Sequence, residues 1–401
     1  MRSAFAIAFE QLDSVIVANQ SLWRPQPFTG GDLPWRHTHA RLKDALLALS
    51  DTEVLQLHDS AARRLRWFGR LEPQLCAALY TFDPPPTIAV AEIQFDRFDS
   101  VHIPGRKWQQ ILAFAGALPR RALPVVDWCA GKGHLSRIVQ RSQQQPVSCL
   151  EWDSALVTAG EKLALQQQRN IQYFQHNVMQ VLPDACAESE SMHIGLHACG
   201  ALHHRLLQHA ATTSAQVVAL SPCCYHKIST AHYQPLSRAA AASQLQLDRP
   251  ALHLAVQDTV TARSGERRMR ERERLWRLAF DALQRELRNI DEYLSVPSCK
   301  RAVLREDFPG FCRWAADSRQ LQLPEQIDYA HYLQLAKEKH RDILRLDLLR
   351  QIFNRPLELW LVLDCALYLE EHGYRVKVTQ FCEHQLSPRN VLIQAERIAA
   401  C

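Results

Sequence analysis

A short loop with two glycines follows an acidic residue in VVDWCAGKGH, residues 125–134. Asp127 lies at the end of an apolar run, and Gly131 and Gly133 precede a helix-patterned segment that starts near Leu135. Glycines let the backbone approach a ligand closely, and the free N–H groups of a helix N-terminus favour an anion. The loop is therefore predicted to be a cradle for a nucleotide-type ligand, with a plain strand-to-helix turn as the alternative.

Two common phosphate-binding loops fit this segment less well. The nicotinamide fingerprint has a third glycine where Ser136 stands, and a Walker loop needs Ser or Thr after Gly-Lys, where Gly133 follows Lys132. A strand-end acid followed by glycines at alternate positions is instead typical of S-adenosylmethionine enzymes with a Rossmann-like fold. Glu151 ends the next apolar run, where a carboxylate can accept hydrogen bonds from both ribose hydroxyls.

The elements that position these residues alternate between short apolar runs and helix-patterned segments. The runs read as strands and are ALPVVDWC, PVSCLEWD, IQYFQHNV, MHIGLHACG, QVVALSPCC, YRVKVTQF and NVLIQA. Strands separated by helices form βαβ units and a parallel sheet, so the loops after these strands open at the same edge. We expect an α/β protein with a Rossmann-like sheet, a helical N-terminal region and a helical insertion.

Chain breaks at Asp83-Pro84-Pro85-Pro86 and Ile103-Pro104-Gly105 suggest where the segments divide. We expect a helical N-terminal region, a first part of the core, an Arg-rich helical insertion, and a last helix with two strands, at residues 1–105, 106–225, 226–345 and 346–401.

Several segments also carry a family likeness. DWCAGKGHLSRI, LEWD, IGLHACGALHHRLL and SPCCYHKI resemble, in order and spacing, the methyltransferase domain of the glutathione S-transferase C-terminal domain-containing proteins and their methyltransferase-like relatives. SPRNVLIQA near the C-terminus is similar as well, and the resemblance covers about residues 101–228 and 346–396. It implies a seven-stranded class I methyltransferase fold with an antiparallel last strand, and S-adenosylmethionine as the methyl donor.

The expected cofactor site follows from these residues together. The general class I loop begins with a glycine where Cys129 stands, and the relatives that this chain resembles also have Cys there. We expect the methionine portion to be held by Asp127, Cys129, Ala130, Gly131 and Gly133. Glu151 is expected to bind the ribose, and the Trp152 ring and the Asn177 amide are expected to contact the adenine.

The ends of the fourth and fifth strands are expected to border the methyl group. Methyl transfer from a sulfonium mainly requires alignment of donor and acceptor. The candidate catalytic residues are His197, Cys223 and Tyr225, with His197 as a base because its ordinary pKa near 6.5 suits neutral pH.

Two alternatives for the same edge stay open at this point. A zinc site would draw on His197, Cys199, Cys223, Cys224 and His226. Consecutive cysteines on extended chain point in opposite directions and no CxxC pair occurs, so a packed polar loop is preferred and no metal is predicted. Pro222-Cys223 also resembles the nucleophile of pyrimidine C5 methyltransferases, although the rest of that signature is missing.

Composition limits the class of protein and its partners. With 47% hydrophobic and 22% charged residues the chain is neither collagen-like nor disordered, and 47 basic against 42 acidic residues give only +5. Glu10 interrupts the apolar N-terminal run, and LELWLVLDCALYL is too short to span a bilayer, so we expect a cytoplasmic protein with reduced cysteines and no membrane partner.

The Arg-rich run ARSGERRMRERERLWRLAFDALQRELR bears on the acceptor. An ion-paired, solvated helix is indicated by three pairs with (i, i+4) spacing: Glu266 with Arg270, Arg267 with Glu271, and Glu273 with Arg277. The excess of arginines over acidic residues instead favours a groove for the RNA backbone. Whether these pairs form distinguishes the two interpretations. The sequence predicts an S-adenosylmethionine-dependent methyltransferase acting on a macromolecule, RNA or protein. The alternative is a binding protein that keeps the cofactor fold without turnover, because no Asn-Pro-Pro-Tyr motif follows the fourth strand.

Overall fold

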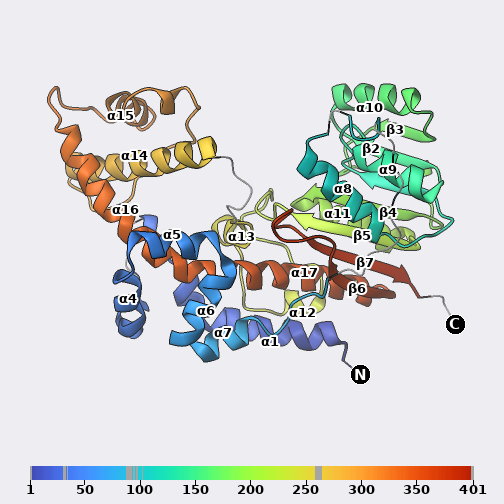
Figure 1. Cartoon of the computed structure of the whole chain (residues 1–401), viewed down its shortest axis with the longest axis horizontal. Helices are drawn as coiled ribbons and strands as arrows, with labels where there is room; N and C mark the ends of the chain where they lie inside the picture. The colour runs from blue at the N-terminus through green and yellow to red at the C-terminus, as the bar shows by residue number, and fades with distance from the viewer. Residues whose placement is uncertain are drawn as a thin grey trace. The chain divides into compact units, whose positions relative to one another are not determined.

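The chain divides into two units, each assembled from segments that lie far apart in the sequence (Figure 1). The first unit contains residues 1–18, 77–258 and 354–401, and the second contains residues 19–76 and 259–353. The computed structural model describes residues 2–29, 33, 35–86, 93, 95, 98–101, 103–257 and 264–398. No helix in these described ranges is long and apolar enough to cross a membrane.

A seven-stranded sheet organises the described part of the first unit. Its strands are β1 Val125–Trp128, β2 Val147–Glu151, β3 Ile171–Gln175, β4 Met192–Cys199, β5 Val217–Cys223, β6 Tyr374–Gln380 and β7 Val391–Arg397, in the order β3-β2-β1-β4-β5-β7-β6. The pairs among β1 to β5 are parallel, whereas β7 is antiparallel to both β5 and β6. This topology confirms the predicted class I methyltransferase fold and all seven predicted strands.

Helices cover both faces of this sheet. Those against it are α8 Gly105–Ala117, α9 His134–Gln143, α10 Ser154–Gln166, α11 Ala201–Thr213 and α17 Asn354–Glu371. Three more, α1 Ala4–Ala18, α12 Arg238–Ala241 and α13 Arg249–Ala255, pack on α17. A 3-10 turn lies at Asp184–Cys186, and α7 Pro73–Leu79 spans the point where the chain passes between the two units. Successive side chains of a strand point to opposite faces. Val125 of β1 thus joins the apolar core with α8, α9 and α10, while Trp128 bonds His193 of β4 at 2.9 Å and packs on His209 of α11.

Local sequence explains where several of these helices start and stop. The Asp153 carboxylate accepts the backbone N–H of Ala155 at 2.8 Å, which caps α10. α17 is buried over most of its length, as expected for LELWLVLDCALYL, and Gly373 follows it with a φ of +84°. That left-handed conformation favours glycine, and it lets the chain turn directly into β6.

The second unit is helical throughout its regular elements. These are α2 Gln20–Trp23, α3 Trp35–Thr38, α4 Ala40–Leu47, α5 Asp51–Asp59, α6 Ala61–Leu71, α14 Ser264–Arg288, α15 Phe308–Asp317 and α16 Tyr329–Gln351, with 3-10 turns at Pro27–Thr29 and Val303–Arg305. Ser50 and Glu53 form the capping box of α5. Arg345 of α16 donates a hydrogen bond to the Asp51 carboxylate at 2.6 Å, so residues 19–76 and 259–353 share one folded unit.

Candidate active site

Asp127 lies buried at the end of β1, with 2% of its surface exposed. Its Oδ2 accepts a hydrogen bond from the Ser136 hydroxyl at 2.5 Å, which links β1 to the first turn of α9. Burial raises the pKa of Asp127 to about 7, although the Ser136 hydrogen bond acts in the opposite direction. The carboxyl group thus supports the loop from inside the fold.

The loop between β1 and α9 is held in a conformation that suits glycine. Cys129, Gly131 and Gly133 have φ values of +57°, +59° and +64°. The backbone N–H of Ala130 donates to the carbonyl of Leu150 at 3.0 Å, which ties the loop to β2. Burial raises the pKa of the Cys129 thiol to about 12, so this residue is a neutral thiol in the cradle.

Gly133 is required by space as well as by conformation. A Cβ atom at this position would lie 2.1 Å from the Tyr173 hydroxyl oxygen, whereas one on Gly131 would meet nothing within 4 Å. We expect Gly133→Ala to lower the free energy of unfolding by roughly 2–4 kcal/mol, from left-handed strain and overpacking together.

Chemical denaturation of matched variants tests this expectation. Gly131→Ala has the strain without the clash and should lose about 1–2 kcal/mol. Gly133→Ala combined with Tyr173→Phe removes the nearest atom and should recover part of the loss. Equal losses at the two glycines would show that Tyr173 does not restrict this loop.

Glu151 connects the end of β2 with the glycine loop. Its Oε2 accepts the backbone N–H of Gly131 at 2.8 Å, and its Oε1 accepts the N–H of Asp153 at 2.9 Å. An ionised carboxylate has about four lone-pair sites, so two backbone donors leave room for two more. Glu151 is therefore fixed in place with capacity to accept the two hydroxyls of a ribose.

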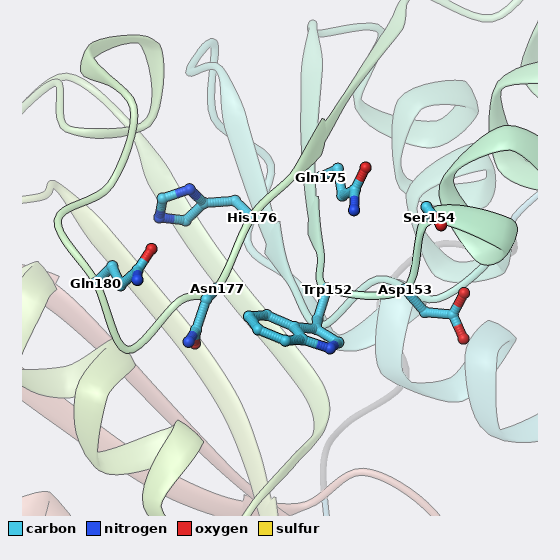
Figure 2. A pocket seen from close by; sticks show the side chains of 7 residues that line it. All are labelled: Trp152, Asp153, Ser154, Gln175, His176, Asn177 and Gln180. Carbon is cyan, nitrogen blue, oxygen red and sulfur yellow. The ribbon is translucent and has the colours of Figure 1, made fainter.

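A pocket of about 500 Å³ lies beside this strand end. Figure 2 shows its lining side chains, which come from the end of β3 and from the segments that follow β2 and β3: Trp152, Asp153, Ser154, Gln175, His176, Asn177 and Gln180. The Trp152 side chain is 68% exposed, and the Asn177 Oδ1 accepts the N–H of Met179 at 3.1 Å. The pocket thus combines an uncovered aromatic face with an oriented amide.

The predicted cofactor residues lie at three different places around the pocket. Trp152 and Asn177 line the pocket, Glu151 adjoins it and bonds the glycine loop, and Asp127 lies buried behind that loop. The sequence did not single out Gln175, His176 or Gln180 as pocket residues. The backbone N–H of His176 donates to the Glu151 carbonyl at 2.8 Å, which holds the end of β3 beside the end of β2. In the sequence, the one indication that His176 lines the pocket is its place directly before Asn177, after the third strand.

The three predicted catalytic residues differ in exposure. His197 is exposed with a φ of +77°, and its Nε2 lies 3.4 Å from Gln110 Oε1. Desolvation by the surrounding protein, followed by the Lys107 cation, lowers the pKa of His197, which favours its neutral form. Cys223 and Tyr225 are only 3% and 1% exposed. The structure thus brings His197 to the surface of the sheet edge and leaves the other two side chains inside.

Comparison with known proteins now assigns this part of the chain. Residues 106–231 match the family model described as a methyltransferase domain. This region is similar to methyltransferase domains, and its strands take the order of a class I methyltransferase fold. S-adenosylmethionine is the cofactor that this site suits: the glycine cradle fits its methionine portion, the acceptor sites left on Glu151 fit its ribose, and the pocket at Trp152 fits its adenine.

Solved structures with similarity to parts of this chain include a tRNA methyltransferase and a protein from Thermus thermophilus. The Pyrococcus abyssi tRNA (uracil-54, C5)-methyltransferase in complex with S-adenosyl-L-homocysteine is 13% identical, with 25% of this chain and 24% of that chain covered and a TM-score of 0.22. TrmN from Thermus thermophilus is 18% identical, with 31% and 41% covered and a TM-score of 0.26. The chain thus spans about a quarter of the first relative and less than half of the second.

Proposed function

We propose that the methyltransferase domain modifies a macromolecular acceptor, RNA or protein. The observation that carries this proposal is the second unit, a helical body of residues 19–76 and 259–353 joined to the methyltransferase fold. An enzyme for a small acceptor has no need of such a body, whereas a macromolecule requires contacts beyond the reacting atom. RNA is the favoured acceptor, because α14 carries more arginines than acidic residues.

The charges of α14 support this choice. Glu273 and Arg277 form the predicted (i, i+4) ion pair at 2.8 Å, whereas Glu266 lies 3.6 Å from Arg301 rather than beside Arg270. The side chain of Arg267 is outside the described residues. Arg268 and Arg270 are exposed and form no ion pair within the described part of the chain, which leaves both cations available to phosphate groups.

Each site residue has a role in this proposal. Asp127 and the loop through Gly133 position the methionine portion, Glu151 accepts the ribose hydroxyls, and Trp152 and Asn177 cover the adenine. The bound cofactor supplies an electrophilic methyl group, so the chain mainly aligns the acceptor and excludes water. The neutral His197 accepts a proton where the acceptor is a hydroxyl or a protonated amine. Cys223 and Tyr225 form the wall of the site behind His197.

Two further parts of the proposal rest on sequence. The HACG and PCCY segments support a relationship to the methyltransferase domain of the glutathione S-transferase C-terminal domain-containing proteins. A cytoplasmic location and the segment limits at residues 105, 225 and 345 also stay predictions.

The proposal is tested with the full chain, radiolabelled S-adenosylmethionine, and total RNA or protein from cells lacking the gene. We expect label in the RNA fraction. Label in protein alone would move the acceptor to the second class, and label in neither fraction would support a binding protein without turnover.

The arginines provide a separate test of RNA contact. We expect the double variant Arg268→Ala/Arg270→Ala to bind RNA more weakly and to reduce the slope of log affinity against log salt by about 1–2, because each phosphate contact contributes roughly 0.7–0.9 to that slope. Arg63→Ala/Arg66→Ala removes two exposed charges from α6 of the same unit and serves as the control. Equal effects of both variants would argue against a specific role for α14.

A further inference from the structure

Three cysteine thiols meet where β4 and β5 end. The Sγ atoms of Cys199, Cys223 and Cys224 all lie within 4.8 Å of one another, and those of Cys199 and Cys223 are 3.4 Å apart. Cys199 and Cys223 are the last residues of their strands and pair in the sheet register. The cluster belongs to the same sheet edge as His197, whose carbonyl accepts the Cys199 thiol at 3.2 Å.

The expectation that the two consecutive cysteines point in opposite directions is wrong, because the chain is not extended there. Cys224 has a φ of +48°, a left-handed conformation that turns its side chain back toward the thiol of Cys223. The turn is closed by the N–H of Lys227, which donates to the Cys224 carbonyl at 2.9 Å. Spacing in the sequence alone does not reveal this turn.

Backbone contacts fix the turn against the end of β4. The N–H of Gly200 donates to the Cys223 carbonyl at 3.0 Å, and the N–H of Ala201 donates to the Lys227 carbonyl at 3.2 Å. A Cβ atom on Gly200 would lie 2.0 Å from that same Lys227 oxygen, so only glycine allows this approach. The backbone therefore holds the three thiols together without a disulfide, and all three cysteines are free.

We propose that Cys199, Cys223 and Cys224 bind a zinc ion with a fourth coordination position left open. Tetrahedral zinc with Zn–S bonds of about 2.3 Å separates its sulfurs by about 3.8 Å. The sulfur separation here is 3.4 Å for Cys199 and Cys223 and no more than 4.8 Å for the other two pairs, a range that includes that value. Small side-chain rotations suffice to place the three sulfurs around one ion.

The chemistry of the ligands and the access to them favour this ion and this coordination. Thiolates select zinc over the hard cations that prefer oxygen, and binding displaces the three thiol protons into solvent. No fourth His, Cys, Asp or Glu of the described residues offers its ligand atom within the group. Cys199 and Cys224 are partly exposed, which admits the ion and a fourth ligand. Three protein ligands with one open position is the arrangement of catalytic rather than structural zinc sites.

The full-length protein, purified under reducing conditions without chelator, tests the site by metal analysis. We expect about one zinc ion per chain, and cobalt in its place should give the thiolate charge-transfer and tetrahedral d–d absorption of a sulfur-rich site. Cys199→Ser and Cys224→Ser should each weaken zinc affinity by more than the roughly 10–100-fold that follows loss of an outer hydrogen-bond partner.

The controls distinguish a loss of zinc binding from a loss of folding, and neither measurement depends on methyl transfer. Cys299→Ser alters a partly exposed cysteine of α14's unit and should retain full zinc content. Cys223 is buried, so the test uses variants of the partly exposed Cys199 and Cys224. Circular dichroism verifies that each variant is folded. Reduced wild-type protein that takes up neither zinc nor cobalt would overturn the proposal, as would a Cys199–Cys223 disulfide that forms in air while no metal binds.

Discussion

The Glu151→Ala variant is expected to bind S-adenosylmethionine about 10²–10⁴-fold more weakly than the wild-type protein. Each hydrogen bond from a ribose hydroxyl to a carboxylate contributes roughly 1.5–3 kcal/mol, and two such bonds are lost. Each 1.4 kcal/mol is about a tenfold change in affinity. The variant also removes the acceptor of the Gly131 N–H, which loosens the loop that holds the methionine portion.

Isothermal titration calorimetry measures this loss. Glu151→Gln retains a carbonyl oxygen without the charge and should give an intermediate affinity. Glu161→Ala alters an exposed carboxylate on α10 and is the matched control, with no expected change. A Glu151→Ala affinity equal to that of wild type would remove Glu151 from the cofactor site.

The sheet could be predicted because its signals are local. Each strand is a short apolar run, and each crossover is a helix-patterned segment between two runs, so the order of the elements follows from the chain itself. The structure adds one feature that changes the chemistry of the site. In the sequence Ser136 marks only the lack of a third glycine, whereas in the structure its hydroxyl donates to Asp127 and links β1 to α9.

The helical unit could not be assembled from the sequence, since its contacts join residues that lie 294 and 327 positions apart. Arg345 bonds Asp51, and Arg350 Nε donates to the Trp23 carbonyl at 2.8 Å. Neither segment alone shows that its arginine or its acceptor has a distant partner. Cys224 illustrates the same limit at short range, because cysteine has no marked preference for the left-handed conformation that brings the thiols together.

Asp127 gives the second large effect, on stability as a function of pH. Its pKa is raised from an ordinary 3.8 to about 7, mainly by burial. Between about pH 4 and pH 7 the folded protein therefore retains a proton that the unfolded chain has released, so the free energy of unfolding falls as the pH rises. Above pH 7 this loss is complete and on the order of 4 kcal/mol. Asp127→Asn removes the ionisation and keeps an oxygen to accept the Ser136 hydroxyl.

We therefore expect Asp127→Asn to be more stable than the wild-type protein at pH 8, with a difference that shrinks toward zero as the pH approaches 4. Urea unfolding at a series of pH values measures both curves. Asp184→Asn alters an exposed carboxyl group near the sheet and should stay within about 0.5 kcal/mol of wild type throughout. A difference between Asp127→Asn and wild type that is constant with pH would mean that Asp127 is ionised in the fold. Burial at the end of β1 would then not disfavour the charged carboxylate overall, because the hydrogen bond from Ser136 would offset the desolvation of Asp127.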